Sequence, residues 1–443
     1  MEQQKTKLGI NFGFRGWMLL IFEVTAFLVF QAFTNFPMNM LAGLYAPEAE
    51  NPNAALAPIM TAGTLVGIVI QLVLSNFVGK MKSVKPMVLG FGCLTLVSAL
   101  GVAALPAGTF WMICYFLVSV FANIYGMFGI GILIGQWFPT RKGVFMGIAT
   151  FAFPVCNGLM GPFAMIVFPE NAAPNPFMGF LPFLIVGLIG WVIGLVFISD
   201  YPEQVGCYRD NDQSFTKEKA DAMLAAEIEN KRTTVWKLGN TLKTGPVWLI
   251  TIPMGTLLMC SVGMMTMTDG IIGAYEGLDF NMVMGMVMIF AIIGSFVLGL
   301  VDGKFGTKTA ILISEAIMLV SGVLGGIGNE TCTMISIILL AIFMGAGSNF
   351  TVSGAAQYWR REDFSTVFGI VNPVANVLQC VGPTVIAITF GMGVTVPFWV
   401  TAGIAAVSIV LVFLFQPIQV KEADDKYRKA AGKPLDDALV GRK

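Results

Sequence analysis

The sequence predicts an all-α membrane protein with twelve transmembrane helices in two pseudo-symmetric halves of six helices each. Composition is the first of three observations behind this prediction. The 443 residues are 56% hydrophobic and only 12% charged, with a mean hydropathy of +0.78, whereas about a quarter of a soluble domain is charged. Apolar residues also form long continuous runs, and segments of the first half recur in the second.

Twelve apolar runs are long enough to cross a bilayer as helices, because a membrane-spanning helix needs about 20 residues. These spans cover residues 16–45, 54–77, 86–106, 110–137, 143–168, 177–199, 246–275, 281–301, 309–328, 332–359, 365–391 and 396–418. Lipid leaves backbone groups no partners outside a helix or a closed barrel. The runs lack the alternating pattern of barrel strands, so helices are predicted.

Every Lys and Arg, 26 in all, lies in a segment that successive spans place on one side of the membrane. The positive-inside rule assigns that side, with both termini, to the cytoplasm. We therefore expect a multi-pass protein of the cell inner (plasma) membrane. The predicted parts are a cytoplasmic N-terminus (1–15), an N-terminal half (16–199), a cytoplasmic linker (200–244), a C-terminal half (245–418) and a cytoplasmic tail (419–443). A helix is expected in the linker from about Thr216, and the tail is expected to be loosely ordered.

Several kinds of site are excluded by composition. The chain has no His, and its seven Cys lie mostly inside apolar spans without paired spacing, so we interpret them as small buried hydrophobes. No Walker-type GxxxxGK[ST] motif occurs, which argues against ATP drive. Neither a metal nor a cofactor is predicted. The spans also lack the metal ligands or the nucleophile and base that an enzyme would need.

An internal repeat joins the two halves. Gln136 corresponds to Gln357, Gly126 to Gly347, and Gly161-Pro162 to Gly382-Pro383. The offset is 221 residues (347 minus 126), about half of the 443-residue chain. Parallel repeats of this kind place a binding site between the halves near the bilayer midplane.

These features resemble those of the major facilitator superfamily of transporters. The segment "GLVDGKFGTK", with Asp302, Gly306 and Lys308, approaches the loop motif of that family, with one extra residue between the Asp and the Gly. The segment "GQWFPTRKG" is similar to oxalate/formate-antiporter-like and monocarboxylate-transporter-like members. The resemblance implies a secondary active transporter, and not an enzyme, that works as a monomer in the lipid bilayer on a small-molecule substrate and has no nucleic-acid partner.

A small organic solute, a carboxylate before others, is the expected substrate, moved by alternating access with proton coupling or exchange. The spans offer no cation to hold a dianion such as oxalate, so a monoanion moving with a proton, or a neutral solute, stays open. The alternatives are a facilitative uniporter for a neutral solute and a non-transporting sensor on the same scaffold.

Three groups of residues are candidates for these functions. Charged residues where spans leave the membrane serve either as topological anchors or as a gate; these are Arg141, Lys142, Asp302, Lys308, Arg360 and Arg361. Acids inside or at the ends of spans are candidates for proton coupling or simply lie next to cations or water; these are Asp269, Glu23 and Glu315.

Polar side chains near the middle of the spans either pair between helices or line a shared cavity. The predicted substrate-binding set is Gln31, Asn35, Asn123, Tyr125, Asn157, Asn349, Asn372, Asn376 and Gln379. Tyr125 is expected to form an aromatic wall of that cavity.

Overall fold

The computed structural model describes residues 11–48, 52–78, 81–344 and 346–435, and their regular structure is helical. The N-terminal half contains α1 (Gly13–Met40), α2 (Ala42–Tyr45), α3 (Pro52–Val78), α4 (Lys85–Ala104), α5 (Thr109–Ala122), η1 (Asn123–Gly129), α6 (Ile130–Trp137), α7 (Lys142–Ala149), α8 (Ala152–Gly158), α9 (Met160–Val167) and α10 (Pro176–Phe197). The linker contains η2 (Pro202–Val205), η3 (Arg209–Asn211), α11 (Lys217–Arg232) and α12 (Leu238–Lys243). The C-terminal half contains α13 (Gly245–Thr266), α14 (Thr268–Gly273), α15 (Phe280–Phe305), α16 (Thr307–Ile327), α17 (Glu330–Met344), α18 (Ala346–Tyr358), α19 (Arg361–Phe390) and α20 (Val396–Leu414), and α21 (Pro417–Ala430) follows.

Ten helical segments of the described chain are long and apolar enough to span a membrane, and two bent helix pairs raise the number to twelve. The predicted fold class is therefore confirmed. The fifth predicted span is bent by 43° between Gly158 and Met160, and the tenth by 45° between Met344 and Asn349. The seventh predicted span is interrupted at Met267, so that α14 follows α13 as a separate short helix.

Local sequence explains where several helices begin and end. Asp279 caps α15, because its side chain accepts a hydrogen bond of 2.7 Å from the backbone N–H of Met282. Gly306 separates α15 from α16 with a φ of +90°, a conformation that favours glycine. The short connection brings α15 and α16 side by side, and it places Asp302 at the end of α15.

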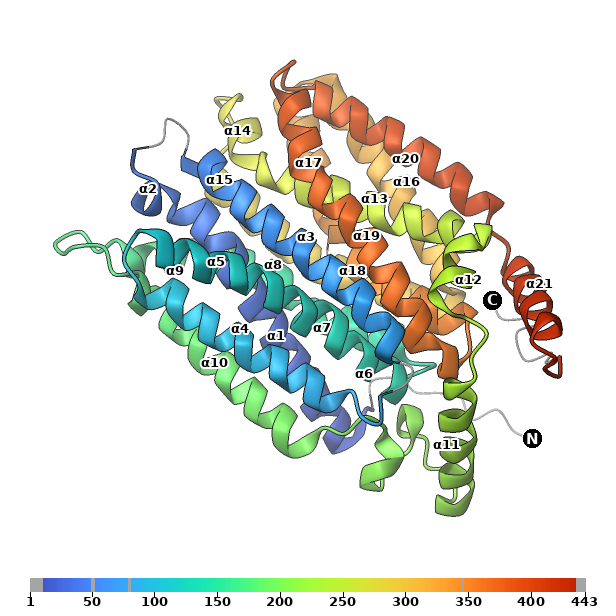
Figure 1. The fold of residues 1–443 in the computed structure, drawn as a ribbon. Helices are drawn as coiled ribbons and strands as arrows, with labels where there is room; N and C mark the ends of the chain where they lie inside the picture. The colour runs from blue at the N-terminus through green and yellow to red at the C-terminus, as the bar shows by residue number, and fades with distance from the viewer. Residues whose placement is uncertain (1–10, 49–51, 79–80, 345, 436–443) are drawn as a thin grey trace.

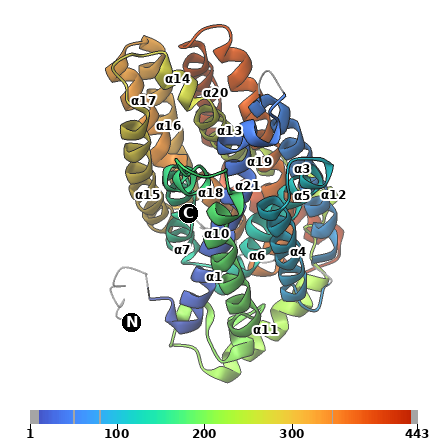
Figure 2. The same ribbon diagram turned by 90° about the vertical axis from the view of Figure 1, so that its left-hand side faces the viewer.

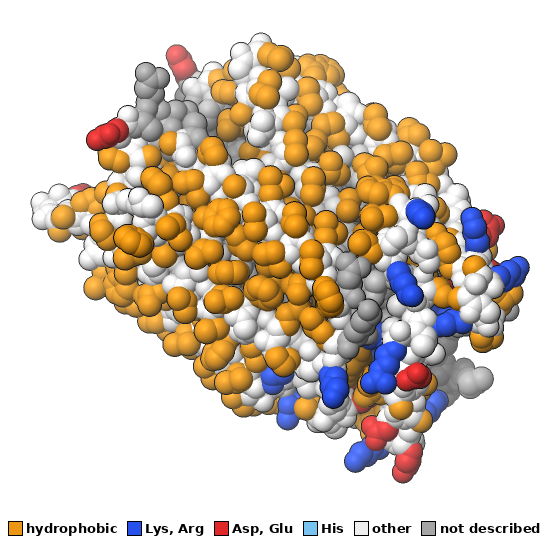
Figure 3. All heavy atoms as spheres, in the orientation of Figure 1, with side chains coloured by type: hydrophobic (Ala, Val, Ile, Leu, Met, Phe, Trp, Pro, Cys, Tyr) orange, Lys and Arg blue, Asp and Glu red, His pale blue; other side chains and the backbone are white. Residues whose placement is uncertain are grey.

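Charge divides the molecule into two ends. Figure 3 shows Lys and Arg side chains gathered at one end, the end at which Figure 1 shows α11, α12 and α21. We call this the basic end and the opposite end the acidic end. Between the two ends, many apolar side chains are exposed on the surface. A large exposed apolar surface is unfavourable in water but stable in contact with lipid. Figure 2 shows helices of the C-terminal half (α15, α16 and α17) on one side and helices of the N-terminal half (α3, α4 and α5) on the other.

The fourth span of each half is irregular at the same position of the repeat. In the N-terminal half, residues Asn123–Gly129 form the π-helix η1, around Gly126. In the C-terminal half, the bend between α17 and α18 lies next to Gly347, the residue that corresponds to Gly126. Single-turn π segments inside α-helices occur frequently at functional sites. The fourth span of the N-terminal half is therefore a candidate for part of a site, and so is the corresponding bent span of the C-terminal half.

The linker and the tail are folded against the basic end. Thr216 caps α11 as the sequence predicts, accepting a 3.4 Å hydrogen bond from the backbone of Lys219. The tail differs from the expectation of a loosely ordered segment, because its residues form most of α21. Asp424 of α21 is fully buried and accepts hydrogen bonds from Trp236 Nε1 at 3.0 Å and from Arg360 at 2.8 Å. The charged composition of the tail reflects docking contacts rather than solvation alone.

Lys231 makes the docking of α11 sensitive to pH. Burial lowers the pKa of this side chain from 10.5 to about 8. Because the folded pKa is the lower one, the penalty is complete below about pH 8 and disappears as pH rises to 10.5. We expect Lys231→Met to stabilise the docked linker at neutral pH, by at most about 3 kcal/mol. Limited proteolysis of the linker should slow in this variant and should lose the protection that the wild type gains at higher pH; equal cleavage of the two proteins would contradict this.

Candidate functional site

Aromatic side chains of α19 fill a glycine groove on the other half at the basic end. Phe364 and Phe368 are buried and stack with ring centroids 5.4 Å apart. A Cβ atom on Gly135 would lie 2.0 Å from Phe364, and one on Gly131 would lie 2.7 Å from Phe368. Only glycine leaves room for the rings, so α6 and α19 approach each other closely here.

A second glycine contact joins α7 and α15. A Cβ atom on Gly299 would lie 2.6 Å from the carbonyl oxygen of Gly143 and 3.0 Å from Cα of Gly147. Small residues allow such close approach of helix backbones. The seam between the halves is thus glycine-lined on both sides of the basic end, and it continues along α8, where Gly158 adjoins Met288.

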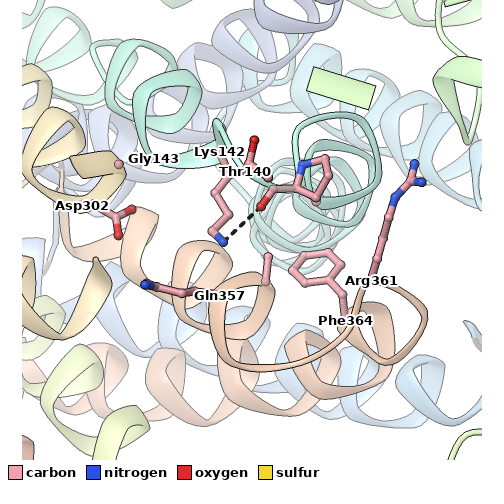
Figure 4. A pocket seen from close by; sticks show the side chains of 11 residues that line it. Thr140, Lys142, Gly143, Asp302, Gln357, Arg361 and Phe364 are labelled. Carbon is pink, nitrogen blue, oxygen red and sulfur yellow. Dashed lines mark hydrogen bonds between the residues drawn. The ribbon is translucent and has the colours of Figure 1, made fainter. Parts of the chain in front are cut away.

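Between these two contacts lies a cavity of about 360 Å³, lined by Lys142, Asp302, Gln357 and Arg361 among others. Figure 4 shows Lys142 and Asp302 around this cavity, and the side chain of Lys142 donates to the carbonyl of Pro139 at 3.3 Å. Asp302 accepts a 2.6 Å hydrogen bond from Thr307 and interacts electrostatically with Lys142 of the opposite half. Two residues of the predicted gate are therefore brought together across the seam.

Arg361 is the second cation at the seam. It belongs to the C-terminal half, but its guanidinium binds Glu227 at 2.8 Å and Glu203 at 3.3 Å, both in the linker. It also donates to the carbonyl oxygen of Gln136 in α6. Arg209 binds the same two acids, Glu227 at 2.6 Å and Glu203 at 3.0 Å. The result is a nearly buried network of alternating charge that joins α19 to the linker and the N-terminal half.

The linker that carries these acids is attached to the N-terminal half. Asp210 accepts hydrogen bonds from the backbone N–H groups of Thr140 and Arg141, at 3.0 and 2.9 Å, at the start of α7. Asp200 does the same for Val84 and Lys85, at 2.9 and 2.8 Å, at the start of α4. Both carboxylates lie at helix N-termini, where the positive end of the helix dipole stabilises a negative charge. Separation of the two halves at the basic end would therefore pull Arg361 away from Glu203.

The other predicted gate residues make contacts within one half. Arg141 donates to the carbonyl oxygen of Asn11 at 3.4 Å. Lys308 donates to the carbonyl of Phe415 at 2.6 Å, which ties α16 to α20. Arg360 binds Asp424 of α21 at 2.8 Å. Their described contacts fit anchors of each half rather than a link across the seam.

A layer of paired polar side chains lies between about 10 and 20 Å from the basic end. Gln71 of α3 donates to Asn123 within the N-terminal half and accepts a 3.4 Å hydrogen bond from Asn372 of α19. Asn372 in turn accepts one of 3.1 Å from Thr351. This chain of amides crosses the seam. Asn349 adds a second crossing, since its amide donates to Thr150 at 3.3 Å.

The remaining predicted binding residues lie nearer the acidic end or away from the seam. Gln31 and Asn35 pair with each other at 2.8 Å along α1 and are half-buried. Asn157 and Gln379 are half-buried as well. Tyr125, the expected aromatic wall, lies instead inside the N-terminal half, where it packs against Phe22 at 5.8 Å. Tyr125 therefore does not line the seam.

Asn376 differs from the other amides of the layer. It is 1% exposed, and neither its oxygen nor its nitrogen has a hydrogen-bond partner among the described residues. Such a group is costly in a protein interior unless something binds it.

The three acids lie in different surroundings. Glu23 in α1 is fully buried, and neither carboxylate oxygen has a hydrogen-bond partner in the described part of the chain. Glu315 lies inside the C-terminal half, where Thr256 is 3.4 Å from one of its oxygens. Asp269 is part of α14, but its side chain lies outside the described residues. All three remain candidates for proton coupling.

Sequence reasoning overlooked Gln71, Glu203 and Glu227. Gln71 is a polar residue inside the second predicted span, which is a signal that the sequence itself offers. Glu203 follows the sixth span directly in a linker rich in cations, and its partner is distant in sequence. No local signal identifies that pairing.

Comparisons with known proteins agree with this architecture. The family model described as Major Facilitator Superfamily matches residues 257–440. No curated protein sequence matches the chain. The fold is similar to that of the proton:xylose symporter XylE bound to 6-bromo-6-deoxy-D-glucose, with 13% identity and a TM-score of 0.66 over 90% of this chain and 95% of that one. It is also similar to the human organic anion transporter MFSD10 (TETRAN), with 10% identity and a TM-score of 0.67 over 90% of this chain and 100% of that one.

At such low identities the solved structures show a shared fold, and the family model adds a match in sequence to the C-terminal half. Together with the membrane spans, they support a multi-pass membrane protein with the fold of these transporters. The chain is thus similar in sequence to the Major Facilitator Superfamily over residues 257–440, and similar in fold to two transporters over nine tenths of its length.

Proposed function

We propose that the protein moves a small organic carboxylate across the membrane by alternating access, driven by a proton gradient or by exchange for a second solute. The proposed orientation has the basic end and both termini in the cytoplasm of a cell whose inner membrane holds the protein. The working unit is the monomer, since the site lies between the two halves of one chain.

The seam is the observation that carries the proposal. At the basic end, glycine contacts and two groups of charges hold the halves together. Halfway through the molecule, amides cross the same seam. Contacts of these kinds can separate and form again without leaving a new cavity in a packed core, as rocking between two openings requires. The arrangement described here is the one closed toward the basic end.

The amide layer is the proposed solute site. Its residues are Asn123, Asn349, Asn372 and Asn376, with Gln31, Asn35, Asn157 and Gln379 toward the acidic end. Amides both donate and accept hydrogen bonds, which suits a polar organic solute. The fold alone does not choose the solute, because one similar structure is of a xylose symporter and the other of an organic anion transporter. The resemblance of "GQWFPTRKG" to monocarboxylate-type carriers favours a carboxylate.

Flux into proteoliposomes tests the proposal. Purified protein is reconstituted, and uptake of a panel of radiolabelled monocarboxylates is measured with and without an inward proton gradient. We expect saturable uptake of at least one acid that rises with the gradient or requires solute inside the vesicles. Flux of a neutral solute that ignores both conditions would support a uniporter instead, and no flux of any solute would support a sensor.

A further inference from the structure

Asn376 offers a ligand one hydrogen-bond donor and one acceptor. Both polar atoms of its amide are buried and without a hydrogen-bond partner among the described residues. The amide nitrogen donates and the amide oxygen accepts, so a donor and an acceptor lie side by side in either rotamer of the amide.

The amide faces the other half of the protein. Phe364, Phe368, Asn372 and Asn376 are spaced by four residues along α19, so each lies one turn beyond the last and about 40° farther around the helix. Phe364 and Phe368 contact the glycine groove of α6, and Asn372 bonds to Gln71 of α3. Asn376 is one turn farther from the basic end than Asn372 and is turned about 40° from it around the helix. It therefore lies at the seam, just beyond the last amide pair that crosses it.

The neighbouring amides bond to one another, and none of them bonds to Asn376. Asn372 uses its nitrogen for Gln71 and its oxygen for Thr351. Gln71 uses its nitrogen for Asn123. No Lys or Arg occurs between Arg361 and the end of α19. A single ligand group that completes Asn376 supplies a donor and an acceptor together, and it meets no positive charge from this helix.

A carboxylate anion does not fit this requirement, because both of its oxygens are acceptors and one of them would face the amide oxygen. An undissociated carboxylic acid does fit: its O–H donates to the amide oxygen while its C=O accepts from the amide nitrogen. We propose that the transported form is the undissociated acid, bound through this two-point pairing to Asn376. This inference rests on the proposed function, and it names the form of the solute.

One consequence concerns the proton. The acid takes up its proton from water on the side where protons are abundant, crosses as a neutral molecule, and releases the proton on the other side. One proton then accompanies each solute without titration of any side chain. Coupling to a proton gradient therefore does not require Glu23, Glu315 or Asp269.

Binding measurements test the charge state of the solute. The full-length protein in lipid nanodiscs is titrated with the radiolabelled monocarboxylate that gives the largest flux, and separately with the primary amide of that acid. Between about pH 5.5 and about pH 7.5, both above the pKa of about 4 to 5 of a simple carboxylic acid, the apparent affinity for the acid should fall about a hundredfold. The primary amide has the same donor and acceptor but does not ionise in this range, so its affinity should stay constant.

Variants assign the effect to Asn376. Asn376→Leu should weaken the binding of both ligands by at least about tenfold. The polar group of the ligand would then be buried without hydrogen-bond partners, which is strongly unfavourable. Asn376→Gln, which keeps both groups on a longer side chain, should bind more weakly with the same dependence on pH. Asn281→Leu, at an exposed position in the first turn of α15, is the control and should bind like the wild type. Glu23→Gln should retain flux driven by the proton gradient.

The possible failures are distinguishable. Equal affinity for the acid at both pH values would show that the anion binds and would overturn this inference, while the proposed transport of carboxylates would stand. Loss of gradient-driven flux in a folded Glu23→Gln variant would also overturn it, because a side chain would then carry the proton. If neither the acid nor its amide bound or moved, the proposed function would fail together with the inference.

Discussion

Replacing Gly299 by Val is expected to prevent closure of the protein at its basic end. A Cβ atom at this position would lie 2.6 Å from a backbone oxygen of α7 and 3.0 Å from a Cα atom. Neither atom can turn aside as a flexible side chain would. Overpacking of this kind costs about 1–3 kcal/mol, and the cost falls only on the conformation in which α7 and α15 touch. The ratio of closed to open molecules should therefore fall by about 5- to 150-fold.

Distances between spin labels measure this change. Ser83 and Lys304 are exposed at the basic end, one in each half, so labels at these positions report their separation. We expect Gly299→Val to shift the distance distribution toward longer values and to slow transport. Gly285→Ala on the same helix is the control, because a Cβ atom there meets nothing within 4 Å. An unchanged distribution in a folded Gly299→Val protein would show that this contact does not limit closure.

Much of the fold is predictable because membrane helices follow from simple physical limits. Span length, the one-sided placement of cations and the repeat at 221 residues each constrain the chain independently. The irregular elements are less predictable. The π-helix η1 begins at Asn123, in a run that is apolar enough to continue as a regular α-helix. The docking of α21 depends on burial of Asp424 against Trp236 and Arg360, and a charged segment with distant partners looks like a solvated tail.

The candidate site is also predictable from the sequence only in part. Depth counting along the spans predicts Asn372 and Asn349 at the level where the structure has the amide layer. Depth alone does not give the face of the helix, so Tyr125 was expected at the seam although it packs inside one half. For the gate, the pairing of Lys142 with Asp302 follows from their places at the ends of spans. The acids that bind Arg361 come from the linker, whose fold the apolar pattern does not predict.

Replacing Arg361 by Gln should favour opening at the basic end as strongly as overpacking does, through loss of attraction rather than added repulsion. The side chains of Arg361 and Glu203 are 8% and 1% exposed. Removal of one partner from such a buried pair leaves the other charge poorly compensated, at a cost of about 2–5 kcal/mol. We expect the lower limit, since Arg209 still binds Glu203 and Glu227. About 2 kcal/mol corresponds to roughly a 30-fold shift between conformations.

Double substitution separates the pair from the rest of the network. The double variant Glu203→Gln with Arg361→Gln should shift the label distances by less than the sum of the two single changes. Each single substitution leaves one buried charge without its partner, and the second substitution removes that charge. Arg232→Gln is the matched control: its pair with Glu229 is 63% and 69% exposed, and such pairs contribute about 0–1 kcal/mol. Additive shifts would mean that Arg361 and Glu203 act independently. In that case the hydrogen bond from Arg361 to the carbonyl oxygen of Gln136 would be the contact that holds α19 to the N-terminal half, and the linker would not take part in the gate.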